Sequence, residues 1–240
     1  MQLHITLKSE KIVLPIAYKY FVQSMIYNAM ENNAAFSRFL HDGGYINEDR
    51  IFKLFTFSPL RGNYSVKDKK ITFSDRVSLE IRSVEPAVIQ PLICSFKKGS
   101  KVNIGRNILT VEKCILKDKI IFQPCVKIKT VSPVTAYVTR DYTNRIYFSP
   151  DDGDFNQLVV NNAKRKWLSA GKKEEQFDLS LKRIDEIPLK KEVTAFKMSH
   201  ITAWHGGFIL EGNPEVINFL YNTGLGSKNS QGFGMFELLE

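Results

Sequence analysis

The order of periodic segments predicts an α+β fold, in which each half of the 240-residue chain carries strands and two helices in a similar order. Two further observations support this. Hydrophobic residues make up 43% and charged residues 25% of the chain, as in an ordinary globular protein. No long linker rich in Pro, Ser or Gly separates the halves. We therefore expect one compact molecule made of two similar domains.

The first half begins with alternating Leu3, Ile5 and Leu7, which predict a half-buried strand over residues 2–8. Residues 16–30 then have helical periodicity, and a second short helical pattern contains Phe36, Phe39 and Leu40. Strands are expected at 51–58, 70–74 and 77–83. A helix is expected from Pro86 to about Phe96, and a strand at 107–116.

The second half repeats the theme. Strands are predicted within 120–138 and at 145–149, followed by a helix over 155–168. Further strands at 176–184, 192–199 and 201–210 precede a helix at 214–222 and a last strand at 233–239. A βαββαβ order in both halves predicts two tandem ferredoxin-like domains, residues 1–116 and 117–240, with a groove between them. This is the fold of RNA-recognition modules, but a fold alone does not assign a function.

The charge balance favours a polyanionic partner, because 34 Lys and Arg oppose 25 Asp and Glu, for a net charge of +9. No apolar run is long enough to span a membrane, and MQLHITLKSEK has no signal-peptide pattern. Cys94, Cys114 and Cys125 are far apart, so we expect neither a zinc site nor disulfides. Buried free thiols and a cytoplasmic location are the expectation.

A glycine-rich segment follows the last predicted helix, with Gly224, Gly226, Gly232 and Gly234 around Lys228, Asn229, Ser230 and Gln231. Glycines permit a backbone whose amides can bind phosphate oxygens, and Lys228 adds a positive charge. The alternative is a helix C-cap followed by a long turn. The spacing matches neither of the familiar nucleotide-binding glycine motifs.

Three side chains of the first half have positions that packing alone does not explain. His41 lies off the apolar stripe of its short helix and precedes Asp42-Gly43-Gly44, so it is either functional or an inert surface histidine. Tyr27 lies opposite its helix's apolar stripe, with its hydroxyl expected to be exposed, and an ordinary surface tyrosine is the alternative. Lys53 interrupts an apolar strand, which indicates either an edge position or an anionic partner.

Several motifs resemble one protein family. GLGSKNSQGFGMFEL resembles the C-terminal glycine-rich loop of the RAMP superfamily, and ITAWHGGFILEG, YFVQSMIYNAM and FLH followed by FKLFTFS resemble its CRISPR repeat endoribonucleases. The resemblance runs from residue 1 to 240, and the middle diverges most. It implies tandem ferredoxin-like domains that cut CRISPR repeat RNA into guide units, without a metal or cofactor. A non-catalytic RAMP-type subunit that holds guide RNA and a plain RNA-recognition module remain the alternatives.

The resemblance also implies roles for individual residues. His41 would transfer protons during attack by the RNA 2′-hydroxyl, Tyr27 would orient it or share its role, and Lys53 would stabilise the phosphorane. The stretch DGGYINEDRIF between His41 and Lys53 is long for the family, which leaves Arg50 as a substitute for Lys53. The products would be a 5′-hydroxyl and a 2′,3′-cyclic phosphate or 3′-phosphate.

A second set of RNA contacts is predicted at Lys164, Arg165 and Lys166, where Trp167 could stack on bases. The alternative is a solvated helix end. His200 and His205 fall on opposite faces of one strand, which argues against a metal site, and His4 could line the cleft. The expected partner is CRISPR repeat RNA, while a homodimer and a place in a CRISPR effector complex both stay open.

Overall fold

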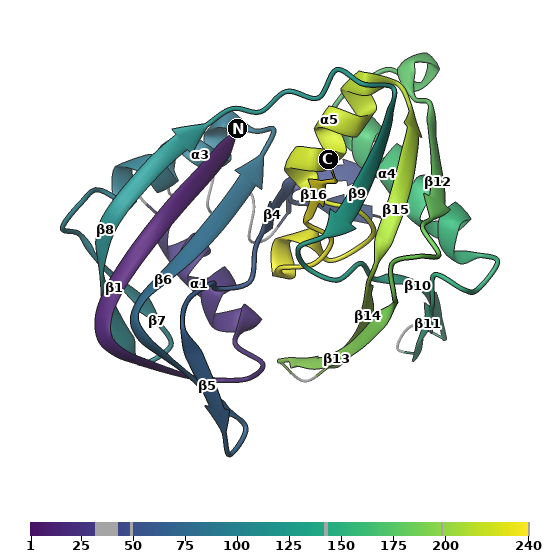
Figure 1. Cartoon of the computed structure of the whole chain (residues 1–240). Helices are drawn as coiled ribbons and strands as arrows, with labels where there is room; N and C mark the ends of the chain where they lie inside the picture. Colours follow the sequence, from purple (N-terminus) through teal and green to yellow (C-terminus); the bar gives the residue numbers. More distant parts are fainter. Residues whose placement is uncertain (32–42, 49, 142–143, 198, 240) are drawn as a thin grey trace.

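The computed structural model describes residues 1–31, 43–48, 50–141, 144–197 and 199–239. It is an α+β protein with two main antiparallel sheets side by side, and the described residues also form three two-stranded sheets (Figure 1). In chain order the first part contains β1 (Gln2–Pro15), α1 (Lys19–Ala29), β2 (Tyr45–Asn47), β3 (Arg50–Phe52), β4 (Phe55–Phe57), β5 (Tyr64–Lys67), β6 (Lys70–Ser83), α3 (Pro86–Ser95), β7 (Lys101–Ile104) and β8 (Asn107–Lys117). The second part contains β9 (Cys125–Thr130), β10 (Ala136–Arg140), β11 (Asn144–Phe148), α4 (Phe155–Ser169), the 3-10 turn η1 (Glu174–Gln176), β12 (Leu179–Arg183), β13 (Lys190–Phe196), β14 (Ser199–His205), β15 (Gly207–Gly212), α5 (Pro214–Thr223), the 3-10 turn η2 (Asn229–Gln231) and β16 (Phe236–Leu238).

Both sheets have ferredoxin-like topology, which confirms the predicted fold class. The first has the order β4-β6-β1-β8, with β7 added at one edge and β5 paired with β6. The second has the order β12-β15-β9-β16. In each sheet the first strand of the βαββαβ unit therefore lies between the third and the fourth, and all pairs are antiparallel.

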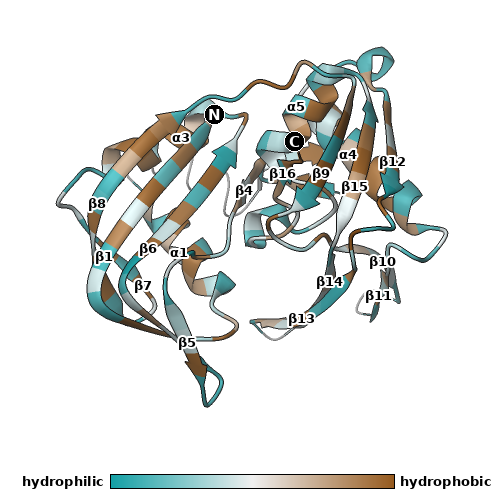
Figure 2. Cartoon of the chain, in the orientation of Figure 1, coloured by the Kyte–Doolittle hydropathy of each residue, from teal (hydrophilic) through white to brown (hydrophobic). Residues whose placement is uncertain are grey.

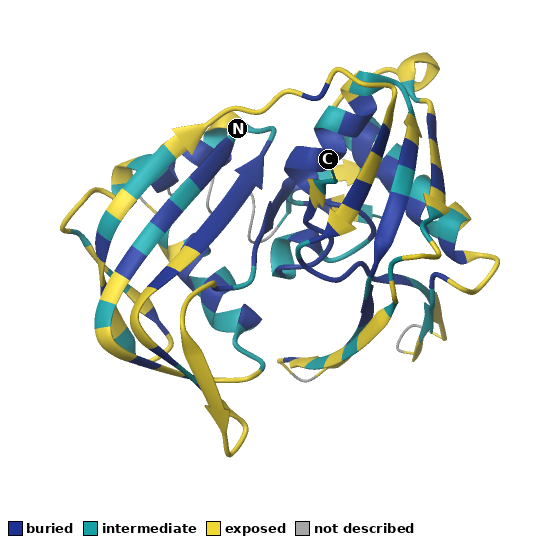
Figure 3. Cartoon of the chain, viewed as in Figure 1, coloured by how far each residue is buried: buried dark blue, intermediate teal, exposed yellow. Residues whose placement is uncertain are grey.

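The two larger of three hydrophobic clusters follow from the helical and strand periodicities. Val22, Met25 and Ile26 of α1 and Val88 and Leu92 of α3 pack on buried residues of β1 and β6. Helices α4 and α5 pack in the same way on β9 and β15 through a second cluster. Figure 2 shows apolar and polar residues alternating along β1, β6 and β8, and Figure 3 shows the matching alternation of buried and exposed positions along β1 and β8.

The two halves are joined by a buried arginine. Arg82 of β6 is 3% exposed, pairs with Glu80 at 2.6 Å and donates to the carbonyl oxygen of Phe236 at 2.7 Å. Its guanidinium also lies 3.9 Å from the ring centroid of Tyr221 on α5. Because a buried charge is tolerated only when it is paired and hydrogen-bonded, these contacts fix the second half against the first.

Two hairpins are inserted into the second unit. The hairpin β10–β11 lies between β9 and α4, and the hairpin β13–β14 lies between β12 and β15. They contact each other, because the Tyr147 hydroxyl donates to the His200 carbonyl oxygen at 3.1 Å. The second hairpin reaches α1, where the rings of Phe196 and Tyr20 meet edge to face.

Several strand predictions need correction. Residues 51–58 are not one strand, because Leu54 has a φ of 51° and separates β3 from β4. Residues 70–74 and 77–83 form the single strand β6, in which Asp75, with a φ of 63°, lies at the break in register against β1. The edge strand β7 has no counterpart in the sequence-based prediction. The domain boundary near residue 117 stays a prediction.

The cysteines do not have the expected burial. Cys94 and Cys125 are exposed and Cys114 is half-buried, so the prediction of buried thiols is wrong. Cys94 on α3 and Cys125 on β9 face solvent, which overrides the general tendency of free cysteine to be buried, whereas Cys114 on β8 packs against the first hydrophobic core. No helix in the described part of the chain is long and apolar enough to cross a membrane.

Candidate active site

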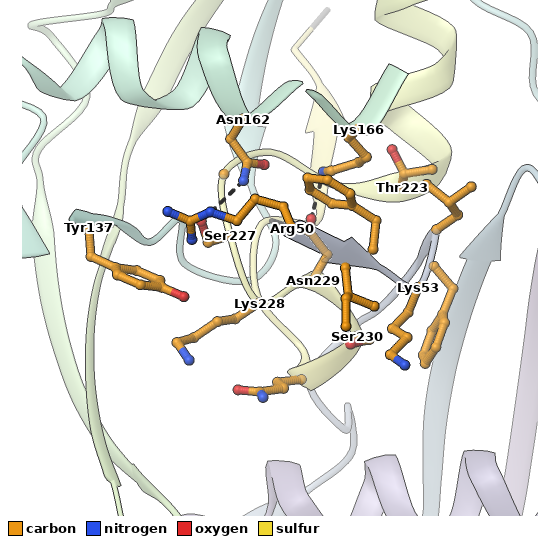
Figure 4. A pocket seen from close by; sticks show the side chains of 16 residues that line it. Arg50, Lys53, Tyr137, Asn162, Lys166, Thr223, Ser227, Lys228, Asn229 and Ser230 are labelled. Carbon is orange, nitrogen blue, oxygen red and sulfur yellow. Dashed lines mark hydrogen bonds between the residues drawn. The ribbon is translucent and has the colours of Figure 1, made fainter. Parts of the chain in front are cut away.

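A pocket of about 250 Å³ lies where the two halves meet, bounded by the β3–β4 segment, α4, β10 and the glycine-rich loop, residues 224–234 (Figure 4). A second pocket of about 250 Å³ adjoins it along β10 and α4. The two pockets share Arg50, Tyr137, Asn162, Gly226 and Ser227. We call the two together the groove.

The glycines of the loop are needed for its fold. All four are buried, with φ between 63° and 86°. A Cβ atom on Gly234 would lie 1.9 Å from the Leu225 carbonyl oxygen, and one on Gly232 would lie 2.6 Å from the Phe57 ring. The amides of Gly224, Gly232 and Gly234 donate to carbonyl oxygens of the chain itself. The predicted phosphate cradle therefore does not hold for these three glycine amides.

The parts of the loop that reach solvent are Ser227, Lys228, Ser230 and Gln231, all partly exposed. All four line the groove. The backbone amides of Lys228 and Ser230 donate no hydrogen bond within the described residues. These residues are therefore the loop's candidates for side-chain contacts with RNA, and Gly226, which lines both pockets, stays a predicted contact.

Lys228 belongs to a cationic cluster around an aromatic ring. Its Nζ lies 5.2 Å from the ring centroid of Tyr137, and the guanidinium of Arg145 lies 5.5 Å from the same centroid. Burial and the nearby Arg145 charge lower the pKa of Lys228 to about 8. Two like charges held together in this way favour an anion beside them.

Tyr27 is partly buried, in contrast to the expected exposed hydroxyl. Its ring meets Phe55 edge to face at 6.0 Å, and its side chain is hydrogen-bonded to Ser230. Burial raises its pKa to about 12, although the bond to Ser230 opposes this. The prediction was wrong because helical periodicity does not show that the loop, from the other end of the chain, covers this side of α1. Helix α1 and the loop therefore touch directly.

Lys53 and Arg50 both line the pocket in Figure 4. Lys53 Nζ donates to the carbonyl oxygen of Gly43. The left-handed Leu54 directly after Lys53 ends the β3 segment, so this lysine lies at a break between two strands and not inside one. Arg50 also lines the second pocket of the groove, further from β4. His41 lies outside the described residues.

Comparisons with known proteins identify the family of the chain. A family model described as "CRISPR-associated protein Cas6, N-terminal" matches residues 13–115, and one described as "CRISPR associated protein Cas6, C-terminal" matches residues 116–238. The chain belongs to the Cas6 family. A curated relative from Methanocaldococcus jannaschii, named "CRISPR-associated endoribonuclease Cas6 1", is 28% identical over 250 residues, covering 98% of this chain and 91% of that protein.

Two solved structures share the Cas6 fold over the whole chain. One, described as "Characterization of a Cas6-related gene from Pyrococcus furiosus", has a TM-score of 0.84 at 24% identity and covers 100% of this chain and 98% of that one. The other, described as "An RAMP protein binding different RNA substrates", has a TM-score of 0.82 at 22% identity and covers 100% of both chains. At these identities the likeness establishes the fold.

Within this Cas6 chain, the basic run on α4 is divided between surface and core: Lys164 and Arg165 are partly exposed and stay predicted RNA contacts, Arg165 lines the second pocket of the groove, and Lys166 is buried. Lys164 pairs with Glu174 at 2.6 Å, and Arg165 pairs with Glu48 at 3.2 Å. Lys166 is 2% exposed and Trp167 is 1% exposed, so neither an RNA phosphate nor a base can reach them. Lys166 follows Ala163 by three residues, a spacing that puts both on one side of a helix. Ala163 is buried, so this spacing is the sequence signal for the packed position of Lys166.

The remaining histidines lie away from the groove. His205 contacts Glu192 at 3.3 Å and Thr130 at 3.3 Å, and His200 is exposed on the same strand. His4 lines a separate pocket of about 190 Å³ with Glu80 and Arg61. Tyr137 and Arg145, which sequence reasoning missed, are indicated only by aromatic and basic residues interleaved along the hairpin sequence AYVTRDYTNRIYF.

Proposed function

We propose that this chain is an endoribonuclease that binds CRISPR repeat RNA in the groove and cleaves it there. The observation that carries the proposal is the convergence of Tyr27, Lys53 and Lys228 at one loop, although they come from three distant parts of the sequence. The Cas6 family membership and the endoribonuclease name of the Methanocaldococcus jannaschii relative support the same activity. The net charge of +9 supports a polyanionic substrate.

We further propose that the cut uses the RNA's own 2′-hydroxyl and no metal ion. A base removes the 2′-hydroxyl proton, the 2′-oxygen attacks phosphorus, and the bond to the 5′-oxygen breaks as an acid protonates that oxygen. The products are a 5′-hydroxyl and a 2′,3′-cyclic phosphate, which water can open to a 3′-phosphate. His41 is proposed for proton transfer because histidine titrates near neutral pH.

The described residues supply the other requirements of this reaction. A cation at Lys53, or at Arg50, would stabilise the negative charge that develops on the phosphorane. Tyr27 has its pKa raised to about 12, so its hydroxyl is protonated at neutral pH and acts as a hydrogen-bonding group, not as the base. Ser230 holds that hydroxyl, and Lys228, which lines the same groove, is proposed to bind a neighbouring phosphate.

Substrate and assembly are proposed at the level that the family supports. Repeat RNA is the proposed partner, with Ser227, Lys228, Ser230 and Gln231 as its contacts in the loop. Asn229 faces the groove too, but it is 9% exposed and its amide is already engaged within the loop. A homodimer and a place in a CRISPR effector complex stay predictions, as does a cytoplasmic location.

The test is incubation of the protein with its cognate repeat RNA in excess EDTA. We expect a single cut that persists in EDTA, is lost in His41→Ala, and leaves RNA binding by that variant within about 3-fold of wild type. Cleavage that EDTA abolishes would refute the metal-free mechanism. Tight RNA binding by the wild-type protein without any cut would favour a non-catalytic guide-RNA-binding subunit instead.

A further inference from the structure

Lys166 is a buried lysine that neither RNA contact nor an ion pair explains. It is 2% exposed, and its Nζ donates to the Gly224 carbonyl oxygen at 2.7 Å and to Asn229 Oδ1 at 2.6 Å (Figure 4). Burial lowers its pKa to about 7, with no contribution from a charged side chain among the described residues. Enclosing an amine in this way is unfavourable unless its hydrogen bonds do something that an apolar side chain cannot.

Asn229 connects Lys166 to both ends of the loop. Its Nδ2 donates to the carbonyl oxygens of Leu225 at 2.9 Å and Phe233 at 3.1 Å. A Cβ atom at Gly224 or Gly234 would lie 2.6 Å from that same nitrogen. The two ends of the loop therefore close around one side-chain amide, whose oxygen is held by Lys166.

The opposite side of the loop rests on the first half of the chain. Gln23 Nε2 on α1 donates to the Ser230 carbonyl oxygen at 2.7 Å, and Tyr27 is hydrogen-bonded to Ser230. Thr56 of β4 donates to the Phe233 carbonyl oxygen at 3.2 Å. Because Ser230 directly follows Asn229, a change in how α4 holds Asn229 moves the partner of Tyr27.

We propose that Lys166 is a positioning residue of the cleavage site, which acts through Asn229 to hold the glycine-rich loop in register with Tyr27. We call Lys166 and Asn229 the loop anchor. This inference rests on the proposed function, because positioning matters only where RNA is cut. It assigns Lys166 no contact with the substrate, which its burial forbids. Loss of the anchor should therefore lower the rate of the chemical step more than RNA affinity.

The experiment compares Lys166→Met with Lys182→Met. Methionine keeps much of the side-chain length and removes the donors. Lys182 is exposed on β12 and lines none of the groove, so it controls for the loss of one positive charge. Single-turnover cleavage at saturating repeat RNA should fall about 10- to 100-fold in Lys166→Met, with Kd within about 3-fold of wild type. Lys182→Met should cleave as wild type does.

A second variant guards against misfolding of the first. Asn229→Asp keeps an oxygen that accepts a hydrogen bond from Lys166 Nζ, and the new carboxylate offsets the positive charge of that group. The substitution removes the Nδ2 group that donates to the carbonyl oxygens of Leu225 and Phe233. Asn229→Asp should slow cleavage to a similar extent. In the double variant with Lys166→Met, the fold-decrease in the single-turnover rate should be smaller than the product of the two single fold-decreases. Two independent effects that simply multiply would contradict a shared anchor.

Amide hydrogen exchange separates this inference from the proposed function. In Lys166→Met, the amides of Leu225, Gly232 and Gly234 should exchange at least about 10-fold faster than in wild type, while β1 amides stay protected. This readout needs no cleavage. A wild-type protein that does not cut repeat RNA would refute the proposed function. Unchanged loop exchange with wild-type cleavage in Lys166→Met would refute the loop anchor.

Discussion

The side chain of Tyr27 on α1 is hydrogen-bonded to Ser230 in the glycine-rich loop. This contact joins the first helix of one half to the last loop of the other. It places a tyrosine side chain against Ser230, which lines the groove together with Lys53, Arg50 and Lys228. The geometry explains why a loop with four buried glycines matters to the site: its fold presents Lys228 and Ser230 beside polar groups from the first half of the chain.

Removing only the Tyr27 hydroxyl should slow the cut. Tyr27→Phe keeps the edge-to-face contact with Phe55 and loses the bond to Ser230. We expect a single-turnover rate about 10- to 100-fold below wild type with Kd little changed, because the hydroxyl orients reacting groups. Tyr20→Phe, on the same helix and packed on Phe196, is the matched control. An equal effect of both substitutions would show that the loss comes from α1 packing.

The cation that stabilises the phosphorane can be identified by comparing Lys53→Met with Arg50→Met. We expect Lys53→Met to lower the single-turnover rate by about 100-fold or more, because it removes charge stabilisation in the transition state. Arg50→Met should mainly weaken RNA binding. Lys67→Met, on the exposed strand β5, serves as a charge control. The reverse order of rate losses would assign the cation to Arg50, and near-wild-type rates in both variants would contradict the proposed site.

Phosphate binding by Lys228 should depend on pH. Its pKa is lowered to about 8 by burial and by Arg145, so its positive charge is complete well below pH 8 and declines as the pH rises through that value. RNA affinity measured with a non-cleavable repeat should therefore weaken above pH 8. In Lys228→Arg this pH dependence should disappear, because arginine stays charged.

A Lys228→Ala variant gives a second readout of the same contact. The slope of log Kd against log salt concentration should decrease by about 1, as expected when one phosphate contact is lost. An unchanged slope would place Lys228 outside the RNA interface.

A network of Lys19, Glu192 and His205 connects α1 to the β13–β14 hairpin. Because of this network, the free energy of unfolding should depend on pH in the acidic range. Burial opposes ionisation of Glu192, but the hydrogen bond from His205 and the Lys19 charge prevail and lower its pKa to about 2. Its stabilising contribution is therefore present above the unfolded pKa near 4.5 and is lost as the pH falls toward 2.

Glu192→Gln tests this directly in thermal unfolding at several pH values. At neutral pH we expect the variant to be roughly 1–2 kcal/mol less stable than wild type, since one partner of a half-buried ion pair is removed. The difference should shrink as the pH is lowered below 4.5. Glu186→Gln, at an exposed position, is the control, and its stability difference from wild type should not change with pH in this way.

The sequence predicts the fold well because period-2 and helical patterns report local burial, and these patterns recur in β1, α1, α4 and α5. The same patterns mislead where another part of the chain covers a polar side. Tyr27 lies off the apolar stripe of α1 and is still partly buried, because residue 230 folds over it. Lys166 lies in a Lys-Arg-Lys run typical of a solvated helix, yet the loop encloses its ammonium group.

The break at Leu54 shows another limit of sequence reasoning. An apolar run such as IFKLFTFS predicts a continuous strand, since nothing in its composition indicates a left-handed residue. That break, however, positions Lys53 at the groove. Site residues can thus be predicted by type and family motif, while their contacts depend on tertiary packing that local patterns do not report.

The central claim is that the RNA's 2′-hydroxyl is the nucleophile. It is tested most directly by a repeat RNA with a single 2′-deoxy substitution at the scissile nucleotide, incubated with the wild-type protein in EDTA. We expect this RNA to bind with Kd within about 3-fold of the unmodified repeat and to remain uncut, while the unmodified repeat yields a 2′,3′-cyclic phosphate or 3′-phosphate end. Cleavage of the deoxy-substituted RNA at the same position would contradict the claim.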